Sequence, residues 1–221
     1  MALDVKSSFF TTETEELGSG KPNSISEEYL EIVQELNDSL REFTLPAAVK
    51  CVYNPTIYAR QTFEMYVRKY CNTKKRIMFF GMNPGPWGMS QTGVPFGEIS
   101  SVRDWLGIEG PVSKPCNEIR ERPVNGFACT RTEVSEMEGL YNICDPILVK
   151  VLKLYEVEII VAIGKFCETR AQKALKKYMP CNNIKILYLS HPSPRTVNNN
   201  NWDQKALEQL KAHDLLKYYK K

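Results

Sequence analysis

The sequence predicts an α/β fold with three layers, α/β/α, around a short and mainly parallel sheet. Three short apolar runs alternate with longer amphipathic patterns of helical period, which is the order of strands and crossover helices. Each run is too apolar for a strand with one face in water, so we expect helices on both faces of the sheet. The 221 residues are enough for one domain with a full core. We therefore expect a single domain over residues 24–221, after a flexible tail over residues 1–23 that is rich in Ser, Thr, Glu and Gly.

Two helices and a strand are expected in the first third of the chain. Ser24 and Glu27 have capping-box spacing ahead of an apolar stripe, which predicts a helix over about 25–41. A second helical pattern covers roughly 56–71. The apolar run 76–80 stops at a glycine and is short for a helix, so it predicts a buried strand.

The middle of the chain is expected to be mostly irregular. Residues 81–97 hold five glycines and three prolines, yet they also carry Met, Trp and Phe, which flexible linkers rarely contain. A short helix is expected at about 100–106. Residues 107–134 are broken by three prolines and predict a loop.

Alternating elements return in the last third of the chain. Capping-box spacing recurs at Ser135 and Glu138, and apolar residues follow at helical intervals. The predicted elements are a helix at about 136–155, a strand at 157–163, a helix at 166–178, a strand at 184–189 and a helix at 202–218.

Composition excludes several classes of protein. The 29 Lys and Arg against 26 Asp and Glu give a net charge of +3, which is too small to identify a nucleic-acid binder by charge alone. The seven cysteines form no C-x-x-C pair and there are only two histidines, so neither a zinc site nor a disulfide framework is predicted. We expect an intracellular protein without a membrane span, because no apolar run is long enough and the first residues lack the order of a secretory signal.

The loop after the first predicted strand is one candidate for chemistry, because ligands bind beyond the carboxyl ends of strands in open parallel sheets. Prolines at 84 and 86 stiffen this loop, and glycines such as Gly85 allow a ligand to approach the backbone. Asn83 offers one acceptor and two donors but cannot act as a strong base, so it could position water without deprotonating it. The alternative is a rigid structural turn. The loop lacks the G-x-G-x-x-G spacing of a dinucleotide site.

The loop after the last predicted strand is the other candidate. His191 follows the strand directly and could donate a hydrogen bond to an oxygen that gains charge. A structural histidine is the alternative, and the position at a strand end favours the chemical role. Residues 196–201, with Lys205 after them, could contact phosphates or form a solvated loop.

These two loops carry a resemblance to a known family. GMNPGPWGMSQTGVPFGE (81–98) and HPSPR (191–195) closely resemble motifs of the single-strand-selective monofunctional uracil-DNA glycosylases, a branch of the uracil-DNA glycosylase superfamily. The similarity also covers VYNPTIYA (52–59), VRDWLGIEGPV (102–112) and VEIIVAIGKFCETRAQKAL (157–175). It therefore extends over nearly all of the chain after the tail.

The resemblance implies an enzyme that extrudes a damaged base from DNA and hydrolyses its N-glycosidic bond without a metal or cofactor. His191 matches the histidine that donates to the base carbonyl, and Asn83 matches the asparagine that positions the attacking water. Phe96 matches the aromatic residue that stacks on the base, and the amides of Met82 and Phe96 match the donors to it. Gly85 belongs to the same substrate-binding loop. The residues that match the DNA-binding wedge and its surroundings are Pro192, Ser193, Pro194, Arg195, Thr196, Asn198, Asn199 and Lys205.

The chain departs from this family at one place. The family carries a segment of several tens of residues with an Asn-x-Cys-Pro motif, whose asparagine reads the uracil edge. Here TEVSE (132–136) runs almost directly into the next helix, which indicates an internal deletion near 136–138 and the loss of one edge strand. Asn142 could be proposed as a substitute, but it lies within a helical stripe, and the interpretation as an ordinary helix residue is preferred.

The leading hypothesis is a nuclear, monomeric base-excision-repair glycosylase that removes uracil and 5-modified uracils, such as 5-hydroxymethyluracil, from single- and double-stranded DNA. The alternative is a catalytically impaired isoform that binds DNA or folds poorly, because the uracil-reading segment is absent and a lost specificity contact weakens discrimination. A small-molecule-binding α/β domain is disfavoured, because no nucleotide fingerprint accompanies the glycine-proline loop.

Overall fold

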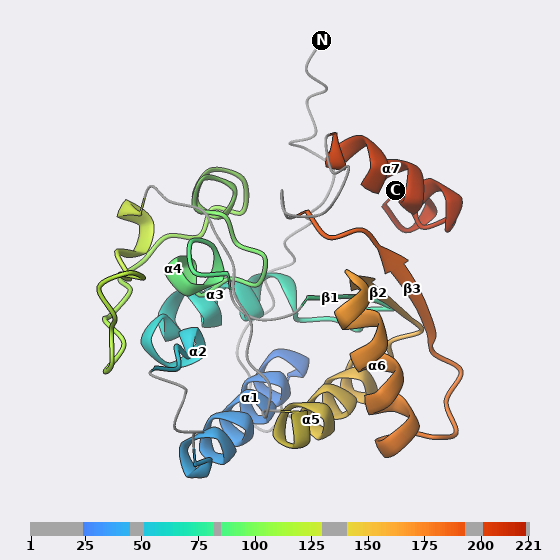
Figure 1. Cartoon of the computed structure of the whole chain (residues 1–221), viewed down its shortest axis with the longest axis horizontal. Coiled ribbons are helices and arrows are strands. Elements are labelled where there is room, and N and C mark those ends of the chain that lie inside the picture. Colours follow the sequence, from blue (N-terminus) through green and yellow to red (C-terminus); the bar gives the residue numbers. More distant parts are fainter. Residues whose placement is uncertain (1–23, 45–50, 82–84, 130–140, 193–200, 220–221) are drawn as a thin grey trace. The chain divides into compact units, whose positions relative to one another are not determined.

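The structure is a computed structural model that describes residues 24–44, 51–81, 85–129, 141–192 and 201–219 (Figure 1). The chain divides into two compact units, one of residues 23–188 and one that contains residues 189–221. The predicted tail, residues 1–23, lies outside the described residues, and the single domain over 24–221 stays a prediction. No helix in the described part of the chain is long and apolar enough to cross a membrane.

The helix predicted at about 25–41 is confirmed, whereas the one predicted at 56–71 is divided in two. Helix α1 spans Ile25–Glu42, and the hydroxyl of Ser24 caps it by accepting a hydrogen bond from the Glu27 amide at 3.3 Å. The single helix predicted over 56–71 is wrong in detail, because two helices, α2 (Pro55–Tyr58) and α3 (Arg60–Tyr70), stand there. They are separated at Ala59, whose φ of −109° and ψ of 32° leave the helical range.

Three strands form the sheet in the order β1-β2-β3: β1 is Ile77–Phe80, β2 is Ile159–Ile163 and β3 is Lys185–Leu189. Strands β1 and β2 are parallel, with Ile77 opposite Ile159 and Phe80 opposite Ala162. All five residues of β2 are buried, so both faces of the central strand are covered. The predicted α/β class with a short parallel sheet is confirmed.

Helix α5 (Tyr141–Leu154) precedes β2, and α6 (Lys165–Tyr178) joins β2 to β3. Helix α1 packs on α5, α5 packs on α6, and α6 packs on β2, so these three helices and the sheet share one core (Figure 1). The residues at its centre are Leu152, Tyr155, Val157, Ile160, Ala171 and Leu175. The start predicted for α5 near residue 136 lies outside the described residues.

The connection from β1 to α5 is more ordered than the sequence predicted. It contains the one-turn helix α4 (Met89–Thr92), a π-helical turn at Ser101–Trp105 and a 3₁₀ helix at Gly126–Ala128. A second apolar cluster stabilises this region, with Val94, Val102 and Ile108 fully buried. The loop predicted at 81–97 therefore folds around a short helix of its own.

The second unit contains α7 (Trp202–Ala212), followed by a 3₁₀ helix at Leu216–Tyr219. A single helix was predicted over 202–218. The helix instead stops because Asp214 has a positive φ of 55°, which turns the chain and buries Leu215 completely.

Candidate active site

The loop after β1 is fixed by a buried glutamine on α4. Gln91 is fully buried, and its amide nitrogen donates to the carbonyl oxygens of Pro86 at 2.7 Å and Pro123 at 3.0 Å. Its amide oxygen accepts a hydrogen bond from the Asn125 N–H at 2.8 Å. Because every polar atom of this side chain is used, Gln91 ties the glycine-proline loop to the segment at 123–125.

A buried threonine closes the next turn. The hydroxyl of Thr92 accepts a hydrogen bond from the Val94 N–H at 3.2 Å. It lies 3.0 Å from the Gly97 carbonyl oxygen and 3.3 Å from that of Gly88, and it donates to the nearer of the two, Gly97. The Gly97 N–H donates in turn to the Val94 carbonyl oxygen at 2.9 Å. Only glycine fits at residue 97, because a Cβ there would lie 2.5 Å from the Val94 oxygen and 2.7 Å from the Thr92 hydroxyl.

Phe96, at the tip of this turn, has an unusual conformation. Its φ is +55°, in the left-handed region that bulky residues rarely adopt, and 60% of its surface is exposed. The ring lies directly against the end of β1, because a Cβ added at Gly81 would be 2.6 and 2.7 Å from two ring carbons. Among the described residues, the Phe96 amide makes no hydrogen bond. The turn thus presents an aromatic face and an unused N–H together, beyond the carboxyl end of a strand.

Glu98 anchors the far side of the turn. Its carboxylate accepts hydrogen bonds from the N–H groups of Ser100 at 3.0 Å and Ser101 at 2.9 Å, and from both serine hydroxyls. These hydrogen bonds stabilise the charged form and lower the pKa of Glu98 to about 2. The carboxylate therefore stays ionised and caps the π-helical turn that follows.

The second candidate loop is fixed at the residue before His191. The N–H and hydroxyl of Ser190 both donate to the side-chain oxygen of Gln209, at 3.0 and 2.7 Å. The Ser190 carbonyl oxygen accepts a hydrogen bond from the Trp202 indole N–H at 2.7 Å. Both partners belong to α7, so this helix determines the direction of the chain as it enters His191. Partial burial lowers the pKa of His191, which favours the neutral imidazole with one N–H to donate.

The predicted site residues are only partly described. Gly85 and Phe96 belong to the first unit, whereas His191, Pro192 and Lys205 belong to the second, and Lys205 is exposed on α7. The predicted residues outside the described ranges are Met82, Asn83, Ser193, Pro194, Arg195, Thr196, Asn198 and Asn199.

Asn142, the possible substitute for the family's uracil-reading asparagine, lies in a helix, as expected. Asn142 is exposed on α5, and its side-chain oxygen accepts a hydrogen bond from Lys177 at 3.4 Å. It has the place of an ordinary helix residue.

Sequence reasoning missed four residues that position the two loops: Gln91, Thr92, Trp202 and Gln209. The signal available for the first pair was their polar character between glycines in a segment otherwise rich in apolar residues. This polar character does not predict their buried hydrogen bonds to residues five or more positions away.

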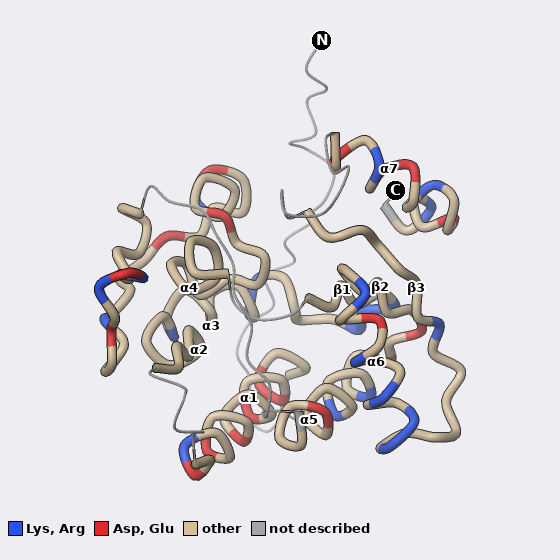
Figure 2. Tube along the Cα trace, in the orientation of Figure 1, with Lys and Arg blue, Asp and Glu red and all other residues tan. Residues whose placement is uncertain are grey.

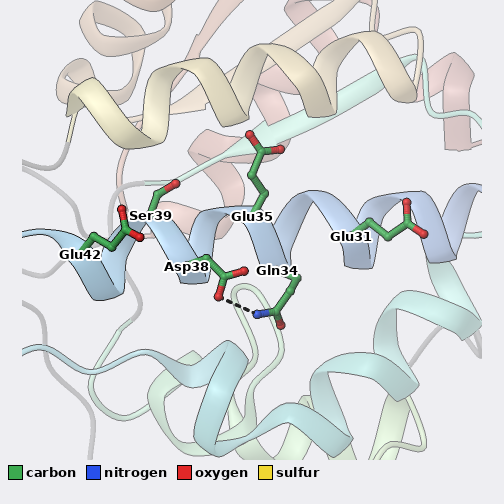
Figure 3. Close-up of a pocket in the computed structure, with 6 residues that line it drawn as sticks. All are labelled: Glu31, Gln34, Glu35, Asp38, Ser39 and Glu42. Atoms are coloured by element: carbon green, nitrogen blue, oxygen red, sulfur yellow. Dashed lines mark hydrogen bonds between the residues drawn. The ribbon is translucent and has the colours of Figure 1, made fainter.

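A hollow on the surface of α1 contains none of the predicted site residues. It is lined by Glu31, Gln34, Glu35, Asp38, Ser39 and Glu42 (Figure 3). Within it, the Gln34 side chain donates to Asp38 at 3.0 Å. Acidic residues gather along α1, whereas basic residues gather along α6 (Figure 2). An acidic lining does not suit a polyanion such as DNA. No group of three or more His, Cys, Asp or Glu side chains in the described ranges could hold a metal ion.

Comparison with known proteins defines the class of this fold and site. Residues 68–211 match the family model of the Uracil DNA glycosylase superfamily, and this range contains both candidate loops. A crystal structure of wild-type SMUG2 from Pedobacter heparinus has a TM-score of 0.53 and covers 86% of this chain and 98% of its own. At 14% identity that likeness shows the fold alone.

Two curated relatives are more similar in sequence. The single-strand selective monofunctional uracil DNA glycosylase of Bos taurus is 36% identical over 244 aligned positions, which cover 88% of this chain and 89% of the relative. The protein of the same description in Mus musculus is 35% identical over 242 positions, with 87% and 86% covered. Because both alignments are longer than this chain of 221 residues, the relatives contain positions that have no counterpart here.

The chain belongs to the single-strand selective monofunctional uracil DNA glycosylases, within the uracil DNA glycosylase superfamily. These enzymes are hydrolases that act on N-glycosyl bonds in base-excision repair. The resemblance of the loops at 81–98 and 191–195 to this family is thereby confirmed. The roles of individual residues, and the deletion near 136–138, stay predictions.

Proposed function

We propose that this chain hydrolyses the N-glycosyl bond of uracil, and of 5-modified uracils such as 5-hydroxymethyluracil, in single- and double-stranded DNA. The observation that carries the proposal is the geometry of Phe96, whose exposed ring and unused amide lie together beyond β1. An aromatic face with an adjacent N–H suits a flipped base, which needs both stacking and hydrogen bonding at its edge. The relatives' description adds uracil and a single-strand preference to that chemistry.

In the proposed reaction, water adds to C1′ of the deoxyribose as the bond from C1′ to N1 breaks. The bonding electrons leave with the base, and the negative charge on N1 spreads onto the flanking carbonyl oxygens. A proton from the water passes to solvent. The uracil anion takes up a proton from solvent, and the products are uracil and a DNA strand with an abasic deoxyribose.

Each proposed residue has one part in this reaction. The neutral imidazole of His191 donates to a base carbonyl oxygen, where a hydrogen bond strengthens as charge develops. Asn83 positions the water, and the amides of Met82 and Phe96 donate to the base. The Phe96 ring stacks on the base, and Gly85 belongs to the same substrate-binding loop.

The loop after His191 is proposed to grip the DNA. Arg195 has the charge and fork-shaped donors to contact phosphates, and the prolines on either side of Ser193 stiffen the segment. Thr196, Asn198 and Asn199 add hydrogen-bond donors, and Lys205 adds a further cation from α7.

The direct test is incubation of the protein with a uracil-containing oligonucleotide, followed by alkaline cleavage of abasic sites. We expect strand cleavage with the wild-type chain. Asn83→Ala and His191→Ala should each lower turnover by about 10²-fold, the typical effect of losing one transition-state hydrogen bond, while DNA binding is largely retained. Equal turnover in the wild-type chain and both variants would refute the assigned roles.

A second function, DNA binding without turnover, is favoured by a separate observation. The relatives contain positions without a counterpart here, and the predicted place of the gap is where the family's uracil-reading segment would lie. Binding of uracil-containing or abasic DNA without product, and with affinity unchanged by His191→Ala, would support this function and contradict the first.

The proposal includes a nuclear location, where chromosomal DNA is the substrate, and a monomeric state. Light scattering coupled to gel filtration tests the second point. A mass near 25.4 kDa is expected, and twice that mass would contradict a monomer.

A further inference from the structure

We infer that Thr92 is a positioning residue for Phe96: its buried hydroxyl closes the turn that holds the ring against Gly81. The functional part of this inference rests on the proposed role of Phe96 in stacking on the base. The structural part rests on hydrogen bonds and packing alone.

Phe96 needs support from the residues around it. A bulky residue with a φ of +55° is strained, and such conformations persist only when the surrounding structure determines them. Phe96 itself supplies little of this support, because most of its surface is exposed. The restraint must come from the residues on either side of it.

The Thr92 hydroxyl joins the residues on both sides of Phe96. It accepts from the N–H of Val94, two residues before Phe96, and donates to the carbonyl oxygen of Gly97, the residue after it. Thr92 is fully buried, so water cannot replace these hydrogen bonds. One hydroxyl therefore sets the separation of the two ends between which Phe96 must turn.

The turn around Gly97 is tightly packed. A Cβ at Gly97 would lie 2.8 Å from a methyl carbon of Val102, in addition to its short distances to Val94 and Thr92. Val94 and Val102 are both fully buried in one apolar cluster. With the base of the turn fixed in the core, a change at residue 92 is taken up at the exposed Phe96.

The structural test is a crystal structure of Thr92→Val, which keeps the shape of the side chain and removes the hydroxyl. The Val94 N–H and the Gly97 oxygen then lose their partner, and we expect Phe96 to return to a negative φ and its ring to leave Gly81. Thr92→Ala makes the same test if the valine variant does not fold. An unchanged Phe96 in either variant would overturn the inference, whether or not the protein has glycosylase activity.

The functional test is a double-mutant cycle on a single-stranded uracil oligonucleotide. Thr92→Val should lower kcat/KM about tenfold, as expected for a buried hydrogen bond, and Thr92→Ser should restore most of it. In a Phe96→Ala background, Thr92→Val should change kcat/KM by less than roughly twofold, because the residue it acts through is gone. An equal loss in both backgrounds would refute action through Phe96. If the wild-type chain lacks activity, the proposed function fails and the crystal structures alone decide on Thr92.

Tyr155 provides a matched control. It is also buried, and its hydroxyl donates to the Cys71 carbonyl oxygen at 2.9 Å, in the apolar cluster around Leu152 and not in the one that holds Val94 and Val102. Tyr155→Phe should lower stability to a similar extent while leaving the Phe96 conformation and kcat/KM unchanged. A matching loss of kcat/KM in Tyr155→Phe would show that Thr92 acts only through general stability, and would refute the inference.

Discussion

His191 shows how burial sets the chemistry of a single residue. Partial burial disfavours the imidazolium, so the pKa of His191 lies below its ordinary value of about 6.5. The proposed role needs a neutral imidazole that donates one hydrogen bond, and the lowered pKa supplies that form at neutral pH. The same residue in open solvent would be charged in a larger fraction of molecules.

We predict that His191 titrates below pH 6.5, measured by NMR of the imidazole protons, with His213→Gln used to assign the signals. The sign for stability follows from the direction of the shift. Below about pH 6.5 the unfolded state takes up the proton first, so the free energy of unfolding falls until the lower folded-state pKa is passed. Above about pH 6.5, His191 causes no further change in the free energy of unfolding. A midpoint at or above 6.5 would contradict the prediction.

Gly81 lies against the Phe96 ring, and its lack of a side chain leaves room for that ring. A methyl group there would overlap the end of the Phe96 ring, which can swing away because it is largely exposed. We predict that Gly81→Ala lowers kcat/KM about tenfold while the free energy of unfolding falls by less than about 1 kcal/mol. Enzyme kinetics and denaturant unfolding measure the two effects. In a Phe96→Ala background the kinetic effect should vanish; if it persists, the overlap is not its cause.

Among the elements, α1 has an end that local sequence fully specifies. The Ser24 hydroxyl satisfies the Glu27 N–H, one of the four amides that a helix leaves without a partner. Ser24→Ala should therefore lower the free energy of unfolding by about 1 kcal/mol, measured by urea titration. Ser39→Ala, within the same helix, is the control and should change stability by less than about 0.5 kcal/mol. Equal effects of the two variants would rule out capping.

The elements also show where sequence reasoning succeeds. Periodicity predicted α1, α6 and all three strands, because each of them buries one stripe or a whole run against a common core. Periodicity did not predict the break between α2 and α3 at Ala59, nor did it predict helix α4. There the backbone is determined by contacts between distant segments: a Cβ at Gly93 would lie 2.7 Å from the Ala59 oxygen, and Gln91 bonds to Pro123. Local pattern carries no information about such contacts.

The same limit applies to the candidate site. For Asn83, Phe96 and His191 the resemblance of the motifs predicts contact with substrate, and these roles stay predictions. Thr92 and Gln209 could not be predicted, because a polar residue is informative only once its buried partners are known. The left-handed conformation of Phe96 had no signal at all, since glycine rather than phenylalanine is the usual residue there.

For the whole molecule, the net charge of +3 implies that DNA binding depends on a few local cations. We predict that Arg195→Ala weakens duplex binding and reduces the slope of log affinity against log salt by about 1, the value for one lost phosphate contact. Fluorescence anisotropy over a salt series measures it. Lys150→Ala is the control, because Lys150 is paired with Glu35 and should leave the slope unchanged. An unchanged slope in Arg195→Ala would remove this residue from the DNA interface.

The hydrogen bond from Trp202 to the Ser190 carbonyl gives the protein an optical reporter beside His191. Indole emission shifts in wavelength when the ring loses a hydrogen bond or meets water. The chain has only two other tryptophans, Trp87 and Trp105. Replacing both with phenylalanine would leave one tryptophan, whose emission reports in real time whether the Ser190 carbonyl stays hydrogen-bonded to α7, with no dye and no labelled substrate.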